Sequence, residues 1–472
     1  MPERLVGITV LPEYFQVEGI DAVLDNLVMA AGANAVTTSP YVMEVADAQS
    51  GSREPPDDAG AGAVRLLDRP LWGQRELFVC TAPSFVPDKQ LYQGLRYQPA
   101  EPTNLTERDG HIVHDLIRAA QSRHLKVYLQ IQAAIPPGYR VQFGGPIEDD
   151  RPQLPDGRVP PRRLAKNGSL ASLHIRHYTQ ALIQDLCRTY PDIDGIRFDW
   201  PEYPPYLLDD LFLDFSPPAQ QAAARLGFDF PRIQRDALAL YRKLHGGLTD
   251  ADLAPLLDQD GGRYALIQFW MNYPGVLELV RFKAALAAEL LAGFRQTMNA
   301  CGAARMELVA HAFPPPWNIS SGLDFQASAS TVSAYCVKLY TMHWAMILRF
   351  YADQLLAANK SGLSDERLGA ALVRLLDLAD DGGLAKATDY HYSEPHEPHP
   401  AGNQAMIRKI GQARRDAGTT PVYALAHGYG PAHDFRRRLT AAWQSSPAGI
   451  WVNRYGYLSD EKLRIIGEVT RR

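Results

Sequence analysis

The sequence predicts an α/β protein built as a (β/α)8 (TIM) barrel with long loops on one face. Eight short apolar segments alternate with amphipathic segments along the 472 residues, which is the order of a parallel barrel. Several connections are rich in proline and glycine and are longer than ordinary loops. A doubly wound open sheet is the alternative. No Gly-x-Gly-x-x-Gly turn follows the first strand, which weakens the dinucleotide-binding form of that alternative.

The expected elements follow one another in a regular order. We expect strands at residues 5–10, 34–38, 126–132, 194–199, 305–311, 334–340, 422–427 and 450–454. We expect helices at residues 19–31, 111–124, 171–189, 276–301, 403–417 and 434–444. The chain then forms one barrel domain over residues 1–472, with insertions at about 41–108, 138–168, 200–275 and 345–402. Because these insertions begin where strands end, they should gather at the carboxyl face, where such barrels carry their chemistry.

The composition is that of an ordinary globular protein. The net charge is −5 and no long run of one charge sign occurs, so we expect neither a nucleic-acid nor a membrane surface. No segment reaches the roughly 18–20 apolar residues of a membrane span. The N-terminus lacks the apolar core of a secretory signal, so we expect a cytoplasmic protein. The cysteines show no CxxC pair, which argues against a disulfide framework or a thiolate metal site: Cys80, Cys187, Cys301 and Cys336.

The fourth expected strand carries charge in an apolar setting, in the segment "DGIRFDWPEY" at 194–203. Side chains alternate along a strand, so Arg197 and Asp199 should share one face while Ile196 and Phe198 share the other. Asp199 falls at the carboxyl end, where barrel residues usually serve function. We expect Arg197 to hold Asp199 ionised and oriented toward a ligand. A purely structural buried ion pair is the alternative interpretation.

Polar and aromatic side chains also end the other strands. A sugar has an apolar face and a rim of hydroxyls, so this mixture suits a carbohydrate. The expected substrate-binding residues are Arg197, Glu13, Trp200, His311, Lys338, Tyr340, His343, Trp344, His427, Asn453 and Arg454, with Gln130 and Gln132 beside them. The expected partner is therefore a carbohydrate substrate. We expect neither a cofactor nor a metal, and the oligomeric state stays open.

Hydrolysis of a glycosidic bond needs two carboxyl groups, and their separation decides whether the sugar retains or inverts its configuration. Asp199 is the first catalytic candidate, as nucleophile or base. Glu202 ranks first as its partner and general acid, because its aromatic setting favours a raised pKa. Glu307 ranks second, near the middle of the fifth strand, although a structural role is the stronger interpretation there. Glu13 ranks third, and the loop residues Asp324 and Asp389 come last.

The fourth strand resembles that of known glycoside-hydrolase barrels. Gly195, Arg197 and Asp199 match a Gly-x-Arg-x-Asp strand of the α-amylase superfamily, which implies that Asp199 is the nucleophile. The closer resemblance is to bacterial glycoside-hydrolase-like barrels with an Asp-Gly-Ile-x-Phe-Asp strand. It extends loosely to "VKLYTMHW" (337–344) and "GIWVNRYGYLSDEKL" (449–463). The chain departs from the α-amylase pattern on strands three, five and seven, which leaves the second carboxylate open.

Other functions remain open at this point. The histidines that end strands five to seven, His311, His343 and His427, together with Asp199 would suit a metal-dependent hydrolase. Lys338 on strand six would suit Schiff-base chemistry. The missing carboxylates on strands five and seven would suit a carbohydrate-binding barrel without catalysis. The loop histidines, His391, His396 and His399, lie among prolines and predict a turn-rich lid.

Overall fold

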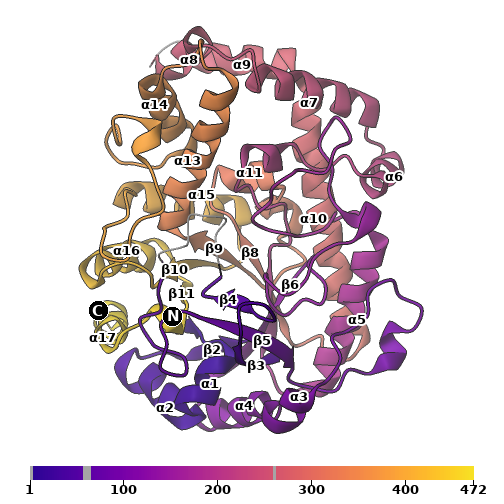
Figure 1. The fold of residues 1–472 in the computed structure, drawn as a ribbon, viewed down its shortest axis with the longest axis vertical. Helices are drawn as coiled ribbons and strands as arrows, with labels where there is room; N and C mark the ends of the chain where they lie inside the picture. The colour runs from indigo at the N-terminus through magenta and orange to yellow at the C-terminus, as the bar shows by residue number, and fades with distance from the viewer. Residues whose placement is uncertain (1–3, 57–64, 259–261, 472) are drawn as a thin grey trace.

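The computed structural model describes residues 4–56, 65–258 and 262–471, and its centre is a closed parallel barrel (Figure 1). The strand order around the barrel is β1-β11-β10-β9-β8-β7-β6-β2. Every expected strand is present, with ends within two residues of those expected, which confirms the predicted fold class. The strands are β1 (Leu5–Thr9), β2 (Ala35–Thr38), β6 (Lys126–Gln132), β7 (Gly195–Asp199), β8 (Glu307–Ala312), β9 (Ala334–Leu339), β10 (Val422–His427) and β11 (Gly449–Asn453).

Helices surround the barrel (Figure 1). The ring consists of α2 (Ile20–Asp25) with a π-helical turn (Asn26–Ala30), α4 (Ile112–Ser122), α5 (Leu173–Thr189), α10 (Pro274–Ala300), α13 (Thr341–Ala358), α15 (Asn403–Ala417), α16 (Ala432–Ser445) and α17 (Asp460–Thr470). The shorter helices are α1 (Pro12–Glu18), α3 (Asn104–Asp109), α11 (Trp317–Ser321) and α12 (Phe325–Ser328). Among the described residues, no helix is long and apolar enough to cross a membrane.

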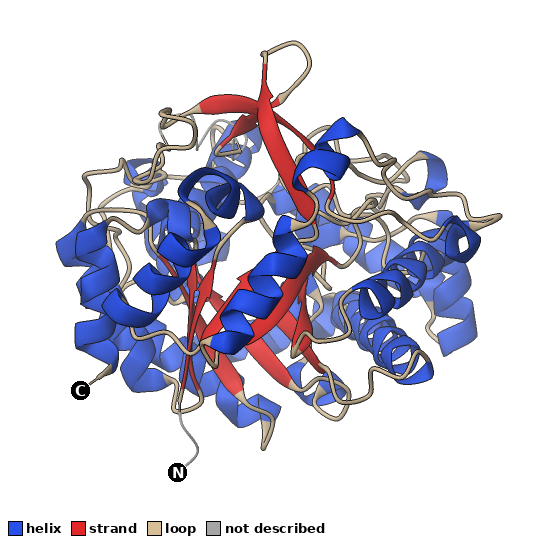
Figure 2. Cartoon of the chain, turned by 90° about the horizontal axis from the view of Figure 1, so that it is seen from below, coloured by secondary structure: helices blue, strands red, loops and turns tan. Residues whose placement is uncertain are grey.

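The long connections contain structure of their own. The first holds a three-stranded antiparallel sheet of order β3-β5-β4, formed by β3 (Tyr41–Ala46), β4 (Ser52–Glu54) and β5 (Leu77–Pro83). This sheet lies at one end of the barrel, away from both chain termini (Figure 2). The later connections hold α6 (Pro217–Leu226), α7 (Phe230–Leu244), α8 (Asp250–Leu257), α9 (Gly262–Asn272) and α14 (Asp365–Leu376). Short 3-10 turns occur at Lys89–Tyr92, Glu148–Asp150, Leu208–Phe212, Ala387–Asp389 and Tyr455–Tyr457.

One connection is more helical than the sequence analysis describes. The insertion expected at 345–402 begins inside α13, which starts at Thr341 directly after β9. Buried side chains lie on nearly every side of the first half of this helix, so its sequence lacks the clear apolar and polar faces that mark a surface helix.

The barrel interior is filled by large side chains around Arg197 and Trp451. The Arg197 guanidinium carbon lies 3.9 Å from the centre of a Trp451 ring, and the residue is fully buried. One guanidinium nitrogen lies 3.4 Å from the hydroxyl of Thr9, and another lies 3.4 Å from the sulfur of Cys336. Gly7, on the adjacent strand, leaves the space that the indole occupies. The interior is therefore a packed core, and the barrel is not a pore.

Replacing Gly7 with alanine tests this packing. An added Cβ would lie 2.3 Å from Cε3 of Trp451, far inside van der Waals contact. We expect Gly7→Ala to lower the free energy of unfolding by about 2–3 kcal/mol, because overpacking forces the ring or the strand to move. Thermal unfolding followed by circular dichroism measures the loss. Gly382→Ala is the matched control, since a Cβ there meets nothing within 4 Å. Equal melting temperatures for the two variants would contradict this packing.

Candidate active site

Asp199 ends β7 and is held by side chains from the next two strands. Its Oδ1 lies 2.7 Å from Nζ of Lys338 on β9 and 3.2 Å from Nδ1 of His311 on β8. Burial alone would raise the pKa of Asp199, but the charge of Lys338 and the contact with His311 outweigh it and hold the pKa well below its usual range. Asp199 is therefore an ionised carboxylate at the carboxyl end of the barrel.

His311 is neutral at ordinary pH. Burial and then the charge of Arg197 lower its pKa to about 4. Because an ionised carboxylate only accepts hydrogen bonds, Nδ1 of His311 must carry the proton that faces Asp199. His311 thus fixes one oxygen of Asp199 without adding a second positive charge beside Lys338.

The expected pairing of Arg197 with Asp199 is wrong. Arg197 points into the barrel interior against Trp451, and Lys338 forms the ion pair with Asp199 instead. Arg197 and Asp199 are both on β7 and share the inward face as expected, but residues two apart lie in different layers of the barrel. The charge of Arg197 still reaches the site indirectly, because it helps to keep His311 neutral.

Asp199 opens into a cleft of about 1000 Å³, which includes the open space at its mouth. Of the residues expected to bind substrate or to catalyse, those that line the cleft are Asp199, Trp200, Lys338, Tyr340, His343, His427, Asn453 and Arg454. Gln130 and Gln132 line it from β6. The backbone is unusual directly beside Asp199: Trp200 has φ of 52°, a left-handed conformation that is costly for a bulky side chain. Such strain is concentrated at functional sites.

Several polar atoms in the cleft wall lack a hydrogen-bond partner among the residues that the structure describes. They are buried, and they belong to donors and acceptors on different elements. Burying a polar group without a partner is unfavourable, so these atoms point to a ligand with many hydroxyls. The atoms are Oε1 of Gln130, Oε1 of Gln132, Oη of Tyr139, Nε1 of Trp200 and Nε of Arg454.

The three highest-ranked partner carboxylates all lie outside this cleft lining. Glu202 is fully buried; its Oε1 accepts a hydrogen bond from the Phe313 backbone N–H at 2.9 Å, and its Oε2 accepts one from the Ser321 hydroxyl. Glu307 begins β8, whereas the sequence predicts it near the strand middle. There it binds Lys126 Nζ at 2.9 Å and the Tyr128 hydroxyl at 2.9 Å, at the opposite end of the barrel.

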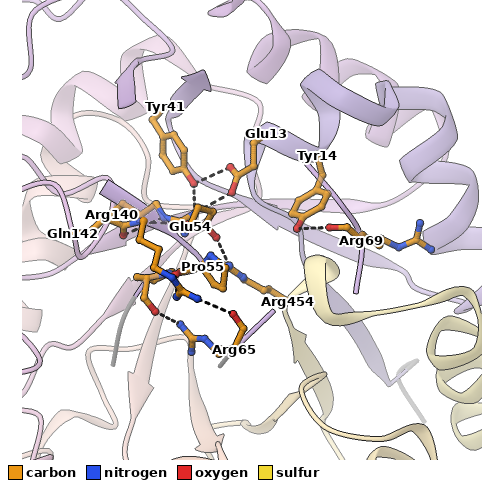
Figure 3. A network of polar contacts seen from close by, with 12 residues as sticks. Glu13, Tyr14, Tyr41, Glu54, Pro55, Arg65, Arg69, Arg140, Gln142 and Arg454 are labelled. Carbon is orange, nitrogen blue, oxygen red and sulfur yellow. Dashed lines mark hydrogen bonds and ion pairs between the residues drawn. The ribbon is translucent and has the colours of Figure 1, made fainter. Parts of the chain in front are cut away.

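Glu13 belongs to a buried network that joins the insertions to the barrel (Figure 3). It lies 3.0 Å from Oη of Tyr41 and 3.1 Å from Nη1 of Arg140, and burial raises its pKa. Glu54 accepts hydrogen bonds from both Arg140 and Arg454. Burial alone would raise the pKa of Glu54, but these two charges lower it. Arg140 and Arg454 also line the cleft. The network therefore lies behind the cleft wall and holds these two side chains in place.

The remaining candidates are placed as follows. Asp324 and Asp389 are exposed and cap short helical turns, since Asp324 accepts from the Gln326 N–H at 2.8 Å and Asp389 from the Lys386 N–H at 3.1 Å. Trp344 is buried against Trp317. In the expected lid, His391 is exposed. His399 is buried 2.7 Å from the Thr341 hydroxyl.

The described residues offer no group of three or more His, Cys, Asp or Glu side chains that could hold a metal ion. Of the three strand-end histidines, His311 faces Asp199, His343 faces Tyr206, and Nδ1 of His427 accepts from the Tyr429 N–H at 3.1 Å. These three histidines therefore do not form the metal site that a metal-dependent hydrolase would need.

Sequence reasoning missed several residues of the cleft wall. They come from the insertions and from the turn after β11, where no short motif marks them. Their only signal in the sequence is position, because each follows the carboxyl end of an expected strand. These residues are Arg65, Tyr139, Arg140, Gln142 and Tyr457.

A scan against protein-family models gives no match to this chain, and a search of curated proteins gives none either. Solved structures with a similar fold include a β-galactosidase from the psychrophilic Marinomonas ef1, with 11% identity and a TM-score of 0.48. That match covers 99% of this chain, which spans 59% of the galactosidase chain. A class V chitinase from Pseudomonas fluorescens Pf-5 has 10% identity over all of both chains and a TM-score of 0.43.

The catalytic domain of a β-amylase from Paenibacillus polymyxa has 9% identity and a TM-score of 0.45, over 97% of this chain and 94% of the amylase. Each of these likenesses concerns the overall fold alone.

The raised pKa of Glu202 predicts how stability changes with pH. Burial raises this pKa to about 7, from an ordinary value of 4.5. Between these pH values the folded protein holds a proton that the unfolded chain releases, so wild type loses stability as pH rises through this window. Glu202→Gln lacks this titration. The unfolding free energy of the variant minus that of wild type should therefore increase by about 3 kcal/mol from about pH 4.5 to about pH 8.

Denaturant unfolding across this pH range measures the difference. Glu107→Gln is the control, because this exchange removes a carboxylate that is exposed on α3. A pH dependence for Glu202→Gln no larger than that for Glu107→Gln would contradict a buried, proton-binding Glu202.

Proposed function

We propose that this protein hydrolyses a glycosidic bond of a carbohydrate bound in the cleft, with Asp199 as its ionised catalytic carboxylate. The observation that carries the proposal is the position of Asp199: a carboxylate kept charged by Lys338, facing a cleft at the carboxyl end of a (β/α)8 barrel. The cleft wall supports a sugar ligand, because donors and acceptors without a partner among the described residues line it together with aromatic rings.

Asp199 suits the role of nucleophile or base and does not suit that of acid. Its low pKa means that it holds no proton to donate, while its charge stabilises the positive charge that develops on the sugar ring. Lys338 is a positioning residue in this proposal, because it acts through the Asp199 carboxylate. His311 fixes the same oxygen, so the rotamer of Asp199 is set before a substrate arrives.

The leaving group also needs a proton, and His343 is our candidate donor. Asp199 is the sole carboxylate that the described residues contribute to the cleft lining. His343 lines the same cleft, and its Nδ1 lies 3.4 Å from the hydroxyl of Tyr206. The centre of the Tyr206 ring lies 6.0 Å from the centre of the Trp200 ring, and Trp200 directly follows Asp199 in the chain. Histidine is the most frequent general acid in enzymes.

A carbohydrate-binding barrel without catalysis is the second candidate function. The specific observation in its favour is that the described residues contribute one carboxylate to the cleft lining, since glycoside hydrolysis ordinarily uses two. This function needs the cleft and its unpartnered polar atoms but does not need the charge of Asp199. The experiment below separates the two functions.

Replacing Asp199 tests the proposed chemistry. We expect wild type to release product from at least one member of a panel of oligosaccharides and aryl glycosides, followed by mass spectrometry. Asp199→Asn should lower that rate at least about 10³-fold, because the nucleophile or base is lost, while sugar binding persists. Asp353→Asn is the control, an exposed carboxylate paired with Arg349 on α13. Saturable binding with no turnover in wild type would favour the binding barrel, and an active Asp199→Asn would remove Asp199 from catalysis.

The role of His343 has a separate test based on the leaving group. A poor leaving group such as a sugar alkoxide needs protonation, whereas a dinitrophenolate departs without it. His343→Gln should therefore lose about 10²–10³-fold in rate on the oligosaccharide but less than about tenfold on the dinitrophenyl glycoside of the same sugar. His391→Gln, an exposed histidine outside the cleft, is the control. Equal losses on both substrates would show that His343 does not protonate the leaving group.

A further inference from the structure

The cleft is walled around most of its circumference. Its lining comes from β1, β2, β6, β7, β9, β10 and β11 or from the segments that follow these strands. None of these lining residues is exposed, and Asp199 has only 14% of its side chain open to solvent. A groove that binds the middle of a long polysaccharide needs two open ends, and its walls then stand on two sides only. The cleft has instead the form of a pocket that is entered from its mouth.

The pocket is small. The volume of about 1000 Å³ includes open space at the mouth, and the cavity itself measures about 160 Å³. A protein cavity of about 150 Å³ holds one six-membered ring. One sugar ring therefore fills the cavity, and any neighbouring sugar of the same chain has to lie at the mouth.

Resting on the proposed function, we infer that the substrate is a glycoside with an unsubstituted sugar at its nonreducing end, and that the protein removes this terminal sugar. The substrate class is then the chain end of an oligosaccharide, or a simple glycoside, and the interior of a polysaccharide is excluded. The scissile bond is the outermost glycosidic bond of the chain.

The floor of the pocket decides which sugar occupies it. Gln132 pairs with Asp199 in the register of β6 and β7, and Gln130 is the next residue of β6 that lines the cleft. Oε1 of each glutamine is buried and lacks a hydrogen-bond partner among the described residues. These amides are therefore placed to bind hydroxyls of the ring whose anomeric carbon meets Asp199. That ring is the sugar on the nonreducing side of the scissile bond, and the leaving group extends through the mouth.

The connection between β6 and α5 supplies an apolar part of the wall. Val141 and Leu164 both line the cleft and are half-buried, whereas Met346 is fully buried in the same lining. Their side chains offer no hydrogen bond to a hydroxyl, so they limit the width of the pocket by shape alone. Truncating either side chain would make room for a substituent on the bound ring without removing a polar contact to the ring itself.

The test compares two forms of an oligosaccharide that wild type hydrolyses, both labelled with 2-aminobenzamide at the reducing end. One form has a free terminal sugar, and the other carries a benzylidene acetal across O4 and O6 of that sugar. We expect the first products, followed by mass spectrometry, to be a monosaccharide and the labelled chain shortened by one sugar. The capped form should react at least about tenfold more slowly, because the acetal clashes with the pocket wall. Isothermal titration calorimetry on Asp199→Asn should show the same preference in binding.

Two wall variants locate the exclusion. Leu164→Ala and Val141→Ala should each raise the ratio of the capped rate to the uncapped rate at least about threefold, because the pocket widens. A ratio is used since it cancels any general loss of activity or stability. Leu226→Ala is the matched control, a half-buried leucine on α6 outside the cleft, and it should keep the wild-type ratio.

First products that come from internal bonds, or equal rates on the capped and uncapped forms, would overturn the inference while leaving the proposed hydrolysis intact. An unchanged ratio in both wall variants would overturn it as well, because this wall would then not exclude the substituent. Binding of the uncapped form alone, without turnover by wild type, would have the opposite meaning: the pocket for a terminal sugar would stand and the hydrolysis would fall.

Discussion

The ion pair between Asp199 and Lys338 is the constraint on which the site depends. It joins β7 to β9 across the intervening β8, and it is almost closed to solvent. Removing two charges from water is unfavourable unless each meets a partner, so the pair is stable only as a pair. Arg197 is a further buried cation in the barrel interior, and burial together with the charge of Arg197 keeps His311 neutral. Lys338 and His311 in turn keep Asp199 ionised.

The cleft above this pair has two sides built from different parts of the chain. Near β7 to β9 the charges of Asp199 and Lys338 cancel, and the reacting bond of the proposed substrate would lie there. On the side of β11 and the insertions, Arg140 and Arg454 line the cleft and form ion pairs with Glu13 and Glu54 of the buried network. Contacts of a substrate with this second side would fix its position on the first.

The barrel could be predicted from the sequence because its signals are local. Each strand is a short apolar run, and the order of strands and helices fixes the parallel topology. The position of Asp199 at a strand end follows from the same count of residues. The partner of Asp199 could not be predicted this way, since Arg197 and Lys338 are both inward cations and only their depth in the barrel distinguishes them. The arginines of the cleft wall were beyond reach for a related reason. Arg65, Arg140 and Arg454 are 75 and 314 residues apart in sequence, and they are brought together by contacts such as those with Glu54 and Tyr457.

The carboxylates ranked as partners of Asp199 show where inference from residue type ends. Glu202, Glu13 and Glu307 each follow or begin a strand, and each carries the chemistry that a general acid needs. In the folded chain every one of them is committed: Glu202 to Phe313 and Ser321, Glu13 to Tyr41 and Arg140, and Glu307 to Lys126 and Tyr128. A buried carboxylate whose oxygens accept fixed hydrogen bonds stabilises the segments that donate them, and it reaches a substrate only by giving up those bonds. Glu202 ties the turn after β7 to the segments after β8, and these flank the ion pair. The glutamates that resemble catalytic residues therefore build the frame of the site, and among the described residues Asp199 is the carboxylate that lines the cleft.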